Sequence, residues 1–302
     1  MTRQPKDIAV QAAPHMPELF PPQRQRSKLP LFIRRYPGIA VGGVALVAIV
    51  FMAAFAPVLG TSDPTHLSAL NRNKPPSAEH WFGTDSLGRD VYSRVIYGAR
   101  VSLTVGFTVA FLSAVIGLLF GMCAGFIKWA DEILMRVMDG VMTIPSILLA
   151  IALVALTKPS VTSVIIAITI VEIPRVARLM RSAVLSIRGQ AYIEAATLSG
   201  TPVPVILLRH VLPNVVSPLM VQVTYVCAHA MLAEAGLSFI GAGAPPSVPS
   251  WGGIMAEGRM LWQIKPYLVF FPALFLSITV LMVNILGDGL RDALDPRTQV
   301  KD

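Results

Sequence analysis

The sequence has little charge and few cysteines. Only 14% of its 302 residues are Asp, Glu, Lys or Arg, whereas about a quarter of a soluble domain is charged. The mean hydropathy of +0.64 agrees with this shortage. Cys123 and Cys227 both lie inside apolar runs, so we expect small buried hydrophobic residues rather than a disulfide or metal ligands. The composition excludes a soluble globular domain and indicates an integral membrane chain.

Motifs that hold a nucleotide or carry out catalysis are also missing. The sequence contains no Gly-x4-Gly-Lys-[Ser/Thr] phosphate loop, no His-Glu-x-x-His and no convincing Ser/His/Asp set. The formal charge is +8, but Lys and Arg form no single basic face interleaved with aromatics, which argues against a nucleic-acid partner. We therefore predict no catalytic residue, no metal site and no cofactor bound by this chain.

Long apolar runs are what the sequence has instead. About 20 apolar residues in a helix cross a hydrocarbon core of about 30 Å. We predict an all-α integral membrane fold with six transmembrane helices. Their approximate residue ranges are 38–58, 101–127, 140–157, 160–179, 215–240 and 267–286. The first run is longer than the roughly 7 to 15 residues of a signal-peptide core, so it is interpreted as an uncleaved span.

The fourth span is the weakest of the six. Glu172, Pro174 and Arg175 interrupt its apolar pattern at what we expect to be its cytoplasmic end. The span reaches membrane length only if Glu172 turns toward protein. Glu172 and Arg175, three residues apart, are expected to satisfy each other locally.

The distribution of Lys and Arg sets the predicted orientation. With six spans, one side of the membrane carries 17 of these residues and the other side 8. The positive-inside rule therefore places the N- and C-termini in the cytoplasm. Residues 1–37 are polar and rich in proline, and we expect a mobile cytoplasmic tail there, with a short C-terminal tail at 297–302.

Three connections between the spans give structural expectations. Residues 128–139 read as a short charged turn, and residues 60–76 as a polar connection. Residues 241–266 are rich in Gly and Pro and carry Trp251 and Trp262, which are expected near the lipid headgroups.

Residues 80–103 are amphipathic at helical period after Ser86, with Asp90 and Arg94 spaced for an i, i+4 pair. This pattern fits two structures equally well. One is a helix lying at the membrane interface, and the other is a solvated lead-in to the second span.

Two ionisable residues of the fifth span are candidate functional groups. Glu234 lies near the outer end of this span, and His229 precedes it by five positions. An intramembrane ionisable residue is a candidate for a substrate contact or a proton relay. A structural role for a partly hydrated Glu234 near the interface is the alternative.

A polar segment at about residues 182–214 separates the fourth and fifth spans. Residues 182–199 can form a helix, 200–204 (Gly-Thr-Pro-Val-Pro) cannot continue it, and 205–211 can resume it before Pro213. The prediction is a helix, a break and a second helix on the cytoplasmic side.

Small side chains in this segment favour contact with a partner. Ala195 and Ala196 allow another backbone to approach closely, Glu194 offers an acceptor, and Gly200 permits a tight turn. An ordinary amphipathic connector is the alternative. The tripeptide Glu-Ala-Ala by itself does not argue against that alternative, because any helix can contain it.

The full spacing resembles the "EAA loop" of bacterial ABC importer permeases. The glycine follows the last alanine by four positions, and Leu-Pro begins twelve positions after the glycine. The resemblance implies that this loop couples transport to ATPase subunits. The residues that carry it are Glu194, Ala195, Ala196, Gly200, His210, Leu212, Pro213 and Asn214.

Further motifs resemble the second membrane subunit of the dipeptide/oligopeptide permease family, and they extend the match from about Leu31 to Pro296. These motifs are Phe82-Gly83-Thr84-Asp85, Gly88-Arg89-Asp90, Tyr97-Gly98-Ala99-Arg100, Leu237-Ser238-Phe239-Ile240-Gly241, Ser250-Trp251-Gly252 and the run from Gly287 to Pro296.

The resemblance implies a type I ABC importer permease fold over residues 38–296, in the bacterial inner membrane. It also implies a second homologous permease, two cytoplasmic ATPases that use ATP and Mg, an extracytoplasmic binding protein and surrounding lipid. Short peptides are the expected substrate, with glutathione, nickel complexes or other small solutes as alternatives. A secondary transporter and a membrane enzyme are the rival classes, but midplane charges, paired repeats and catalytic sets are not evident.

Overall fold

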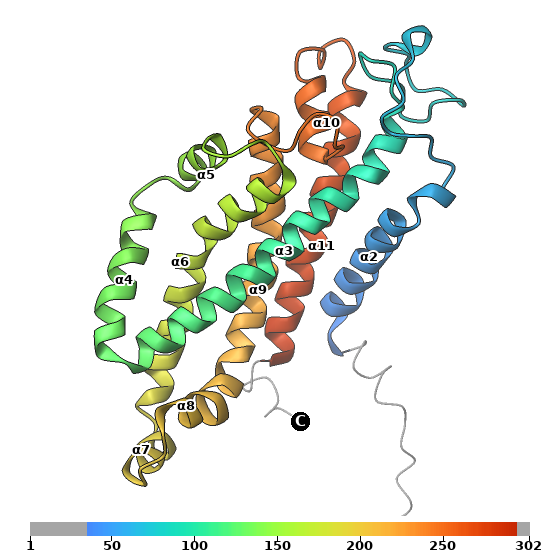
Figure 1. The fold of residues 1–302 in the computed structure, drawn as a ribbon. Helices are drawn as coiled ribbons and strands as arrows, with labels where there is room; N and C mark the ends of the chain where they lie inside the picture. Colours follow the sequence, from blue (N-terminus) through green and yellow to red (C-terminus); the bar gives the residue numbers. More distant parts are fainter. Residues whose placement is uncertain (1–34, 295–302) are drawn as a thin grey trace, which may run out of the picture. The chain divides into compact units, whose positions relative to one another are not determined.

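The computed structural model of the chain describes residues 35–294 (Figure 1). All regular structure in this part is helical, apart from an isolated β-bridge between Thr84 and Asp90. The C-terminal tail at 297–302 and nearly all of the predicted N-terminal tail lie outside the described residues. Only the last residues assigned to that tail are described, and Pro37 already begins α2.

Most helices follow one another with short connections, but residues 55–90 separate α2 from α3 and residues 240–250 separate α9 from α10. Their bounds are α2 (Pro37–Ala54), α3 (Val91–Phe126), α4 (Lys128–Met142), α5 (Ser146–Ala155), α6 (Val161–Arg188), α7 (Ala191–Leu198), α8 (Val203–Ile206), the π-helical turn η3 (Leu207–Val211), α9 (Leu212–Phe239), α10 (Trp251–Gly258) and α11 (Tyr267–Leu294), with single 3₁₀ turns η1 (Ala56–Val58) and η2 (Ala69–Asn71).

Four helices of the described part are long and apolar enough to cross a membrane. They are α2, α3, α11 and the continuous helix Val203–Phe239, which joins α8, η3 and α9. The pair α4 and α5 makes a fifth span if the two helices, bent by 89°, are counted together. The charged helix α6 is not among them, so the sixth crossing stays a prediction.

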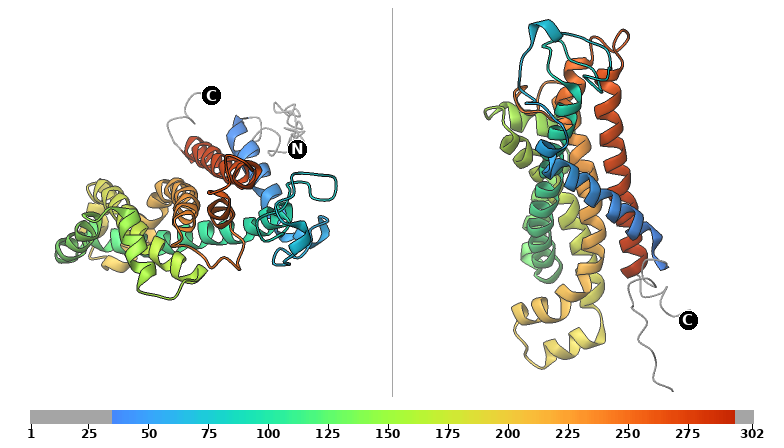
Figure 2. Two further views of the ribbon diagram at one scale, coloured as in Figure 1. Left: turned by 90° about the horizontal axis from the view of Figure 1, so that it is seen from above. Right: turned by 90° about the vertical axis from the view of Figure 1, so that its right-hand side faces the viewer.

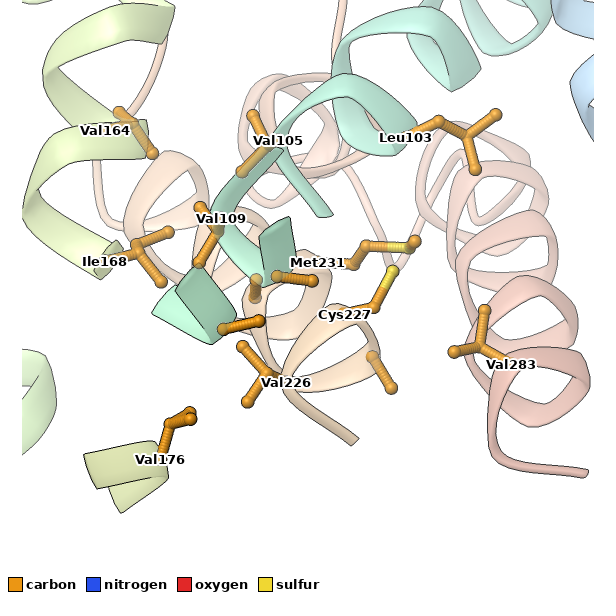
Figure 3. Close-up of a cluster of buried hydrophobic side chains, with 14 of the residues drawn as sticks. Leu103, Val105, Val109, Val164, Ile168, Val176, Val226, Cys227, Met231 and Val283 are labelled. Atoms are coloured by element: carbon orange, nitrogen blue, oxygen red, sulfur yellow. The ribbon is translucent and has the colours of Figure 1, made fainter. Parts of the chain in front are cut away.

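Helix α3 is central to the packing, with α6 on one side and α9 on another. Val105 and Val109 of α3 pack into the same core as Ile168 of α6 and Val226 and Met231 of α9 (Figure 3). All five side chains are buried.

A stripe of glycines on α3 explains how closely α6 approaches. Gly117, Gly121 and Gly125 recur every four residues and therefore lie on one face of the helix. A Cβ built on each would lie 2.5–2.6 Å from the Cβ of Val176, Met180 and Val184 respectively. Small residues at this spacing are a common way for membrane helices to bring their backbones together.

The structure corrects the interpretation of residues 128–157. The predicted turn at 128–139 belongs to helix α4, and the predicted third span at 140–157 contains the end of α4, a break at 143–145 and the ten-residue helix α5. The charged residues of α4 lie along one face, and two of its aspartates form ion pairs with α6. Asp131 bonds Arg181 at 2.5 and 2.6 Å, and Asp139 bonds Arg178 at 2.6 Å.

The lead-in to the second span is not an interfacial helix. Residues 80–90 form a loop, and α3 begins only at Val91 and then continues without a break into the apolar run. Asp90 is the N-cap of α3, with its side chain accepting from the backbone N–H of Ser93. The expected Asp90–Arg94 pair is wrong, because Arg94 bonds Asp85 and Glu257 instead.

The connection at 241–266 is more ordered than its composition suggests. It contains α10, which is capped by Ser250. Trp251 is fully buried, and its indole N–H donates to the backbone oxygen of Val95 at 3.0 Å, so this tryptophan does not belong to a headgroup belt. Trp262 is 59% exposed.

Candidate functional site: a helical projection and an intramembrane polar group

Residues 189–211 form a helical projection at one end of the described unit (Figure 1). Helix α6 ends at Arg188, the short helix α7 follows, and α8 and η3 lead back into α9. The predicted helix, break and helix are confirmed at this coarse level. The predicted continuous helix over 182–199 is wrong, since it is interrupted at Gly189 and Gln190.

The turn after α7 requires glycine for a conformational reason. The backbone of Gly200 has φ +76°, in the left-handed region that side chains with a Cβ disfavour. Its N–H donates to the oxygen of Thr197, and the N–H of Thr201 donates to the oxygen of Ala196. These two bonds form a Schellman motif, in which the glycine must stand four residues after the residue that accepts the long bond. The spacing between Ala196 and Gly200 follows from this geometry.

Pro202 precedes α8 as its extended N-cap, and the two later prolines of the segment do not interrupt the helix. Pro204 lies in the first turn of α8, where a missing N–H leaves no intrahelical bond unmade, and Pro213 follows the π-helical turn η3. The chain therefore runs as one helix from Val203 to Phe239.

The projection has its own small core and a polar clasp at its base. Ile193 and Ile206 are each 1% exposed. The amide of Asn214 donates to the backbone oxygen of His210 at 2.7 Å and to the hydroxyl of Tyr192 at 3.4 Å. His210 and Asn214, which the sequence pattern singled out, are thus brought together with Tyr192.

The outer surface of the projection is available for contact. Glu194, Ala195 and Pro213 are exposed, whereas Ala196 and Leu212 are partly buried. Leu198 is 89% exposed, which is unusual for a leucine in an eight-residue helix. A recess of about 410 Å³ is lined by Glu194, Thr197, Leu198, Ile193, Arg188 and Phe126.

The loops that precede α3 and α10 lie at the opposite end of the same unit (Figure 2). A buried ion cluster holds them together. Asp85 accepts from Arg89 at 2.6 Å and from Arg94 at 2.7 Å, and Glu257 of α10 accepts from both arginines. The sequence pattern included Asp85 and Arg89 among its motifs but gave no signal for Glu257, which lies more than 160 positions away.

The two ionisable residues of α9 have different surroundings. Glu234 is fully buried, and its carboxylate accepts from Ser238 at 2.8 Å and Ser102 at 3.3 Å. The expected partial hydration of Glu234 is therefore wrong. His229 does not approach it but places its Nδ1 2.9 Å from Glu172 of α6.

The expected pairing of Glu172 with Arg175 is confirmed. Glu172 is fully buried, and one guanidinium nitrogen of Arg175 donates to its two oxygens at 2.9 and 3.1 Å. Glu172 and Arg175 lie near the centre of the 28-residue helix α6, and their neighbour His229 is well inside the 28-residue helix α9. Their expected position at the cytoplasmic end of a span stays a prediction.

A family model described as "Binding-protein-dependent transport system inner membrane component" matches residues 113–300, which is more than half of the chain. This chain belongs to that family. It is an inner-membrane permease component of an ABC transport system.

Related proteins align with the permease over most of their length. It is 50% identical to a "Probable peptide ABC transporter permease protein" of Sinorhizobium fredii, over 92% of this chain and 95% of the relative. It is 39% identical to an oligopeptide transport system permease protein of Bacillus subtilis, over 85% of each. It is 41% identical to a glutathione transport system permease protein of Escherichia coli, over 95% and 96%.

The fold is that of an ABC importer permease. A chain of the MetNI methionine ABC transporter, solved in inward facing conformations, superimposes with a TM-score of 0.57 at 22% identity. The match covers 67% of the permease and 96% of that chain.

Proposed function

We propose that the permease forms half of the translocation pathway of an ATP-driven importer of short peptides. The relatives named for peptide and oligopeptide transport, at 50% and 39% identity, support the substrate class. The relative named for glutathione, at 41% identity, makes that small peptide the second candidate. Nickel complexes rest on the family resemblance alone.

The partners we propose are a second homologous permease, two cytoplasmic ATPases and an extracytoplasmic binding protein, with lipid around the spans. ATP and Mg act in the ATPases, and this chain binds no cofactor. The lack of a phosphate-loop motif in the full sequence supports this division of work.

The observation that carries the coupling role is the projection itself. Its exposed Glu194 and Leu198 border a recess, and its turn is fixed by the backbone of Gly200. We assign Glu194, Ala195, Ala196, Gly200, His210, Leu212, Pro213 and Asn214 to the surface and support of this docking element. ATP binding then favours one state of the permease only if the ATPases hold the projection more tightly in that state.

Substitution at two positions tests the coupling role. Replacing Glu194 by Ala removes the acceptor at the recess, and replacing Gly200 by Ala forces a side chain into the left-handed region. We expect both variants to insert into the membrane normally and to lose ATP-dependent uptake in vesicles that contain the partner subunits.

Gly189→Ala is the matched control. This glycine lies in the same segment, a Cβ on it would meet no atom within 4 Å, and its φ of −80° suits any residue. Uptake by Gly189→Ala should equal that of the unmodified protein. Full uptake by both the Glu194 and Gly200 variants would contradict the coupling role.

An ion-gradient-driven transporter is the competing class. Uptake that persists without ATP and collapses when the ion gradient is dissipated would favour it over the importer. Equilibrium binding of candidate solutes to the cognate binding protein tests the peptide class separately, because selectivity of such importers resides largely in that subunit.

A further inference from the structure

Four side chains form a polar group between the middles of α6 and α9. Glu172 and Arg175 come from α6, and Tyr225 and His229 come from α9. The guanidinium carbon of Arg175 lies 5.8 Å from the ring centroid of Tyr225, and the Tyr225 and His229 rings are 6.1 Å apart and nearly parallel. We call this set the α6–α9 polar group.

The depth of the group is fixed by the packing of α6 on α3. Gly117 of α3 meets Val176, which directly follows Arg175. Gly117 belongs to the apolar part of α3 that is long enough to cross the membrane, and His229 belongs to a second such helix. We therefore infer that the α6–α9 polar group lies beside the apolar, membrane-crossing parts of α3 and α9.

Three members of the group are accessible on the surface of this chain. The side chains of Arg175 and His229 are 37% and 33% exposed, and Tyr225 is 49% exposed. Hydrocarbon does not cover a guanidinium at low cost, so charged side chains at this depth face protein or a water-filled passage. This surface of α6 and α9 accordingly faces the interior of the assembled transporter.

The accessible charge of the group is positive. Glu172 is fully buried, so the exposed side chains of this surface are the Arg175 guanidinium and the His229 imidazole. Only one nitrogen of the Arg175 guanidinium bonds Glu172. The Nδ1 of His229 is close to Glu172 but lacks the alignment of a hydrogen bond, so it makes none within the described residues.

A pocket of about 270 Å³ adjoins these groups. His229 and Glu172 line its polar side, and Ile147, Ala150, Leu232 and Leu237 line its apolar side. Ser146, the first residue of α5, also borders it, and the N-terminus of that ten-residue helix favours negative charge.

We propose that the α6–α9 polar group binds the C-terminal carboxylate of a peptide in transit, with the adjoining pocket receiving the last side chain. Arg175 and His229 are the contacting residues, and Glu172 positions both of them. The inference rests on the proposed peptide import, and it assigns to this chain a recognition step separate from that of the binding protein.

The test compares a dipeptide that has a free carboxylate with the same dipeptide as its C-terminal amide. Uptake is measured in vesicles holding the complete transporter with saturating binding protein. The variants are His229→Gln and the double variant Glu172→Gln/Arg175→Gln, which removes both charges of the buried pair together. We expect either variant to lower uptake of the free-carboxylate peptide about tenfold, the loss of one charge-assisted hydrogen bond, and to leave the amide unchanged.

His66→Gln and Arg136→Gln are matched controls. They remove an exposed imidazole and an exposed guanidinium outside the group, and neither should change either rate. Equal loss of both peptides in the site variants, or no loss of either, overturns the proposal. If the binding protein rejects the amide, equilibrium binding of the two peptides to the permease–ATPase complex without binding protein gives the same comparison. Failure of the unmodified complex to carry any peptide refutes the proposed function itself. Uptake of the free-carboxylate dipeptide by the unmodified complex, measured before any variant, reveals that result.

Discussion

At the scale of single residues, the structure explains why glycine occupies particular positions of the chain. Gly200 is kept in the turn by the sign of its φ angle, since a Cβ there would meet no atom within 4 Å. Gly117 and Gly121 of the α3 stripe are required for space and not for their backbone conformation, because a Cβ on either would collide with α6. The sequence alone does not separate these two uses of glycine.

Asp85 joins the loop that precedes α3 to two buried arginines. Its side chain is 4% exposed and bonds two arginines, of which Arg94 is 2% exposed. Asp85→Asn leaves these buried cations with Glu257 as their one remaining carboxylate in the cluster. Breaking a buried ion pair costs about 3–5 kcal/mol. We expect a clear drop in the thermal unfolding temperature of the detergent-purified protein.

Asp63→Asn serves as the control for that measurement. Asp63 is exposed, and the hydrogen bonds of its side chain go to Thr65 two residues away. Its substitution should change the unfolding temperature little. Equal unfolding temperatures for the Asp63 and Asp85 variants would contradict the importance of the cluster.

At the scale of helices, the glycine stripe on α3 explains the close contact between α3 and α6. Gly121→Leu places a branched side chain where a Cβ alone would lie 2.5 Å from that of Met180. Overpacking of this kind costs about 1–3 kcal/mol, and we expect lower thermal stability and less folded protein in the membrane.

Gly140→Leu makes the same chemical change on α4. A Cβ at Gly140 would meet no atom within 4 Å, so this variant should remain as stable as the unmodified protein. A Gly121 variant that unfolds at the same temperature as the Gly140 variant would refute the close-packing explanation.

Long apolar helices were predictable from the sequence, and amphipathic ones were not. The apolar runs predict the spans at α2, α3, α9 and α11 correctly, because each run contains at most one Asp, Glu, Lys or Arg. Helix α4 was mistaken for a turn because its charges suggested solvent, whereas Asp131 and Asp139 bond arginines of α6. Similarly, the i, i+4 spacing of Asp90 and Arg94 has meaning only within a helix, and Asp90 is the cap that precedes one.

For the candidate site, the loop motif predicted which residues belong together but not the polar group inside the membrane. The hydrogen bonds of Asn214 with Tyr192 and His210 join residues of one segment. The Schellman turn at Gly200 likewise involves only neighbouring residues of that segment. The contact between Glu172 and His229 joins helices separated by more than 50 positions. Only the packing of α6 against α9 creates it.

At the scale of the whole chain, orientation is the property that most needs a direct measurement. Leu198 of α7 and Leu70 of η2 are 89% and 91% exposed, and the projection and the loop that precedes α3, to which they belong, lie at opposite ends of the described unit (Figure 2). We expect a membrane-impermeant thiol reagent to label Leu198→Cys only from the cytoplasm and Leu70→Cys only from outside. Labelling of both from one side would contradict the predicted topology.

The unbroken helix from Val203 to Phe239 connects the projection mechanically with the membrane interior. His210 and His229 stand about 28 Å apart along it at 1.5 Å per residue. Pro213 and Pro218 lie between them and lack the N–H that would complete the helical ladder, so bending of this helix is expected at these two positions. If the helix bends at Pro218, His229 lies about 17 Å beyond the bend, and a tilt of about 5° moves it by about 1.4 Å. One continuous helix thus joins the projection, where we propose that the ATPases dock, to the place where we expect the peptide to be held.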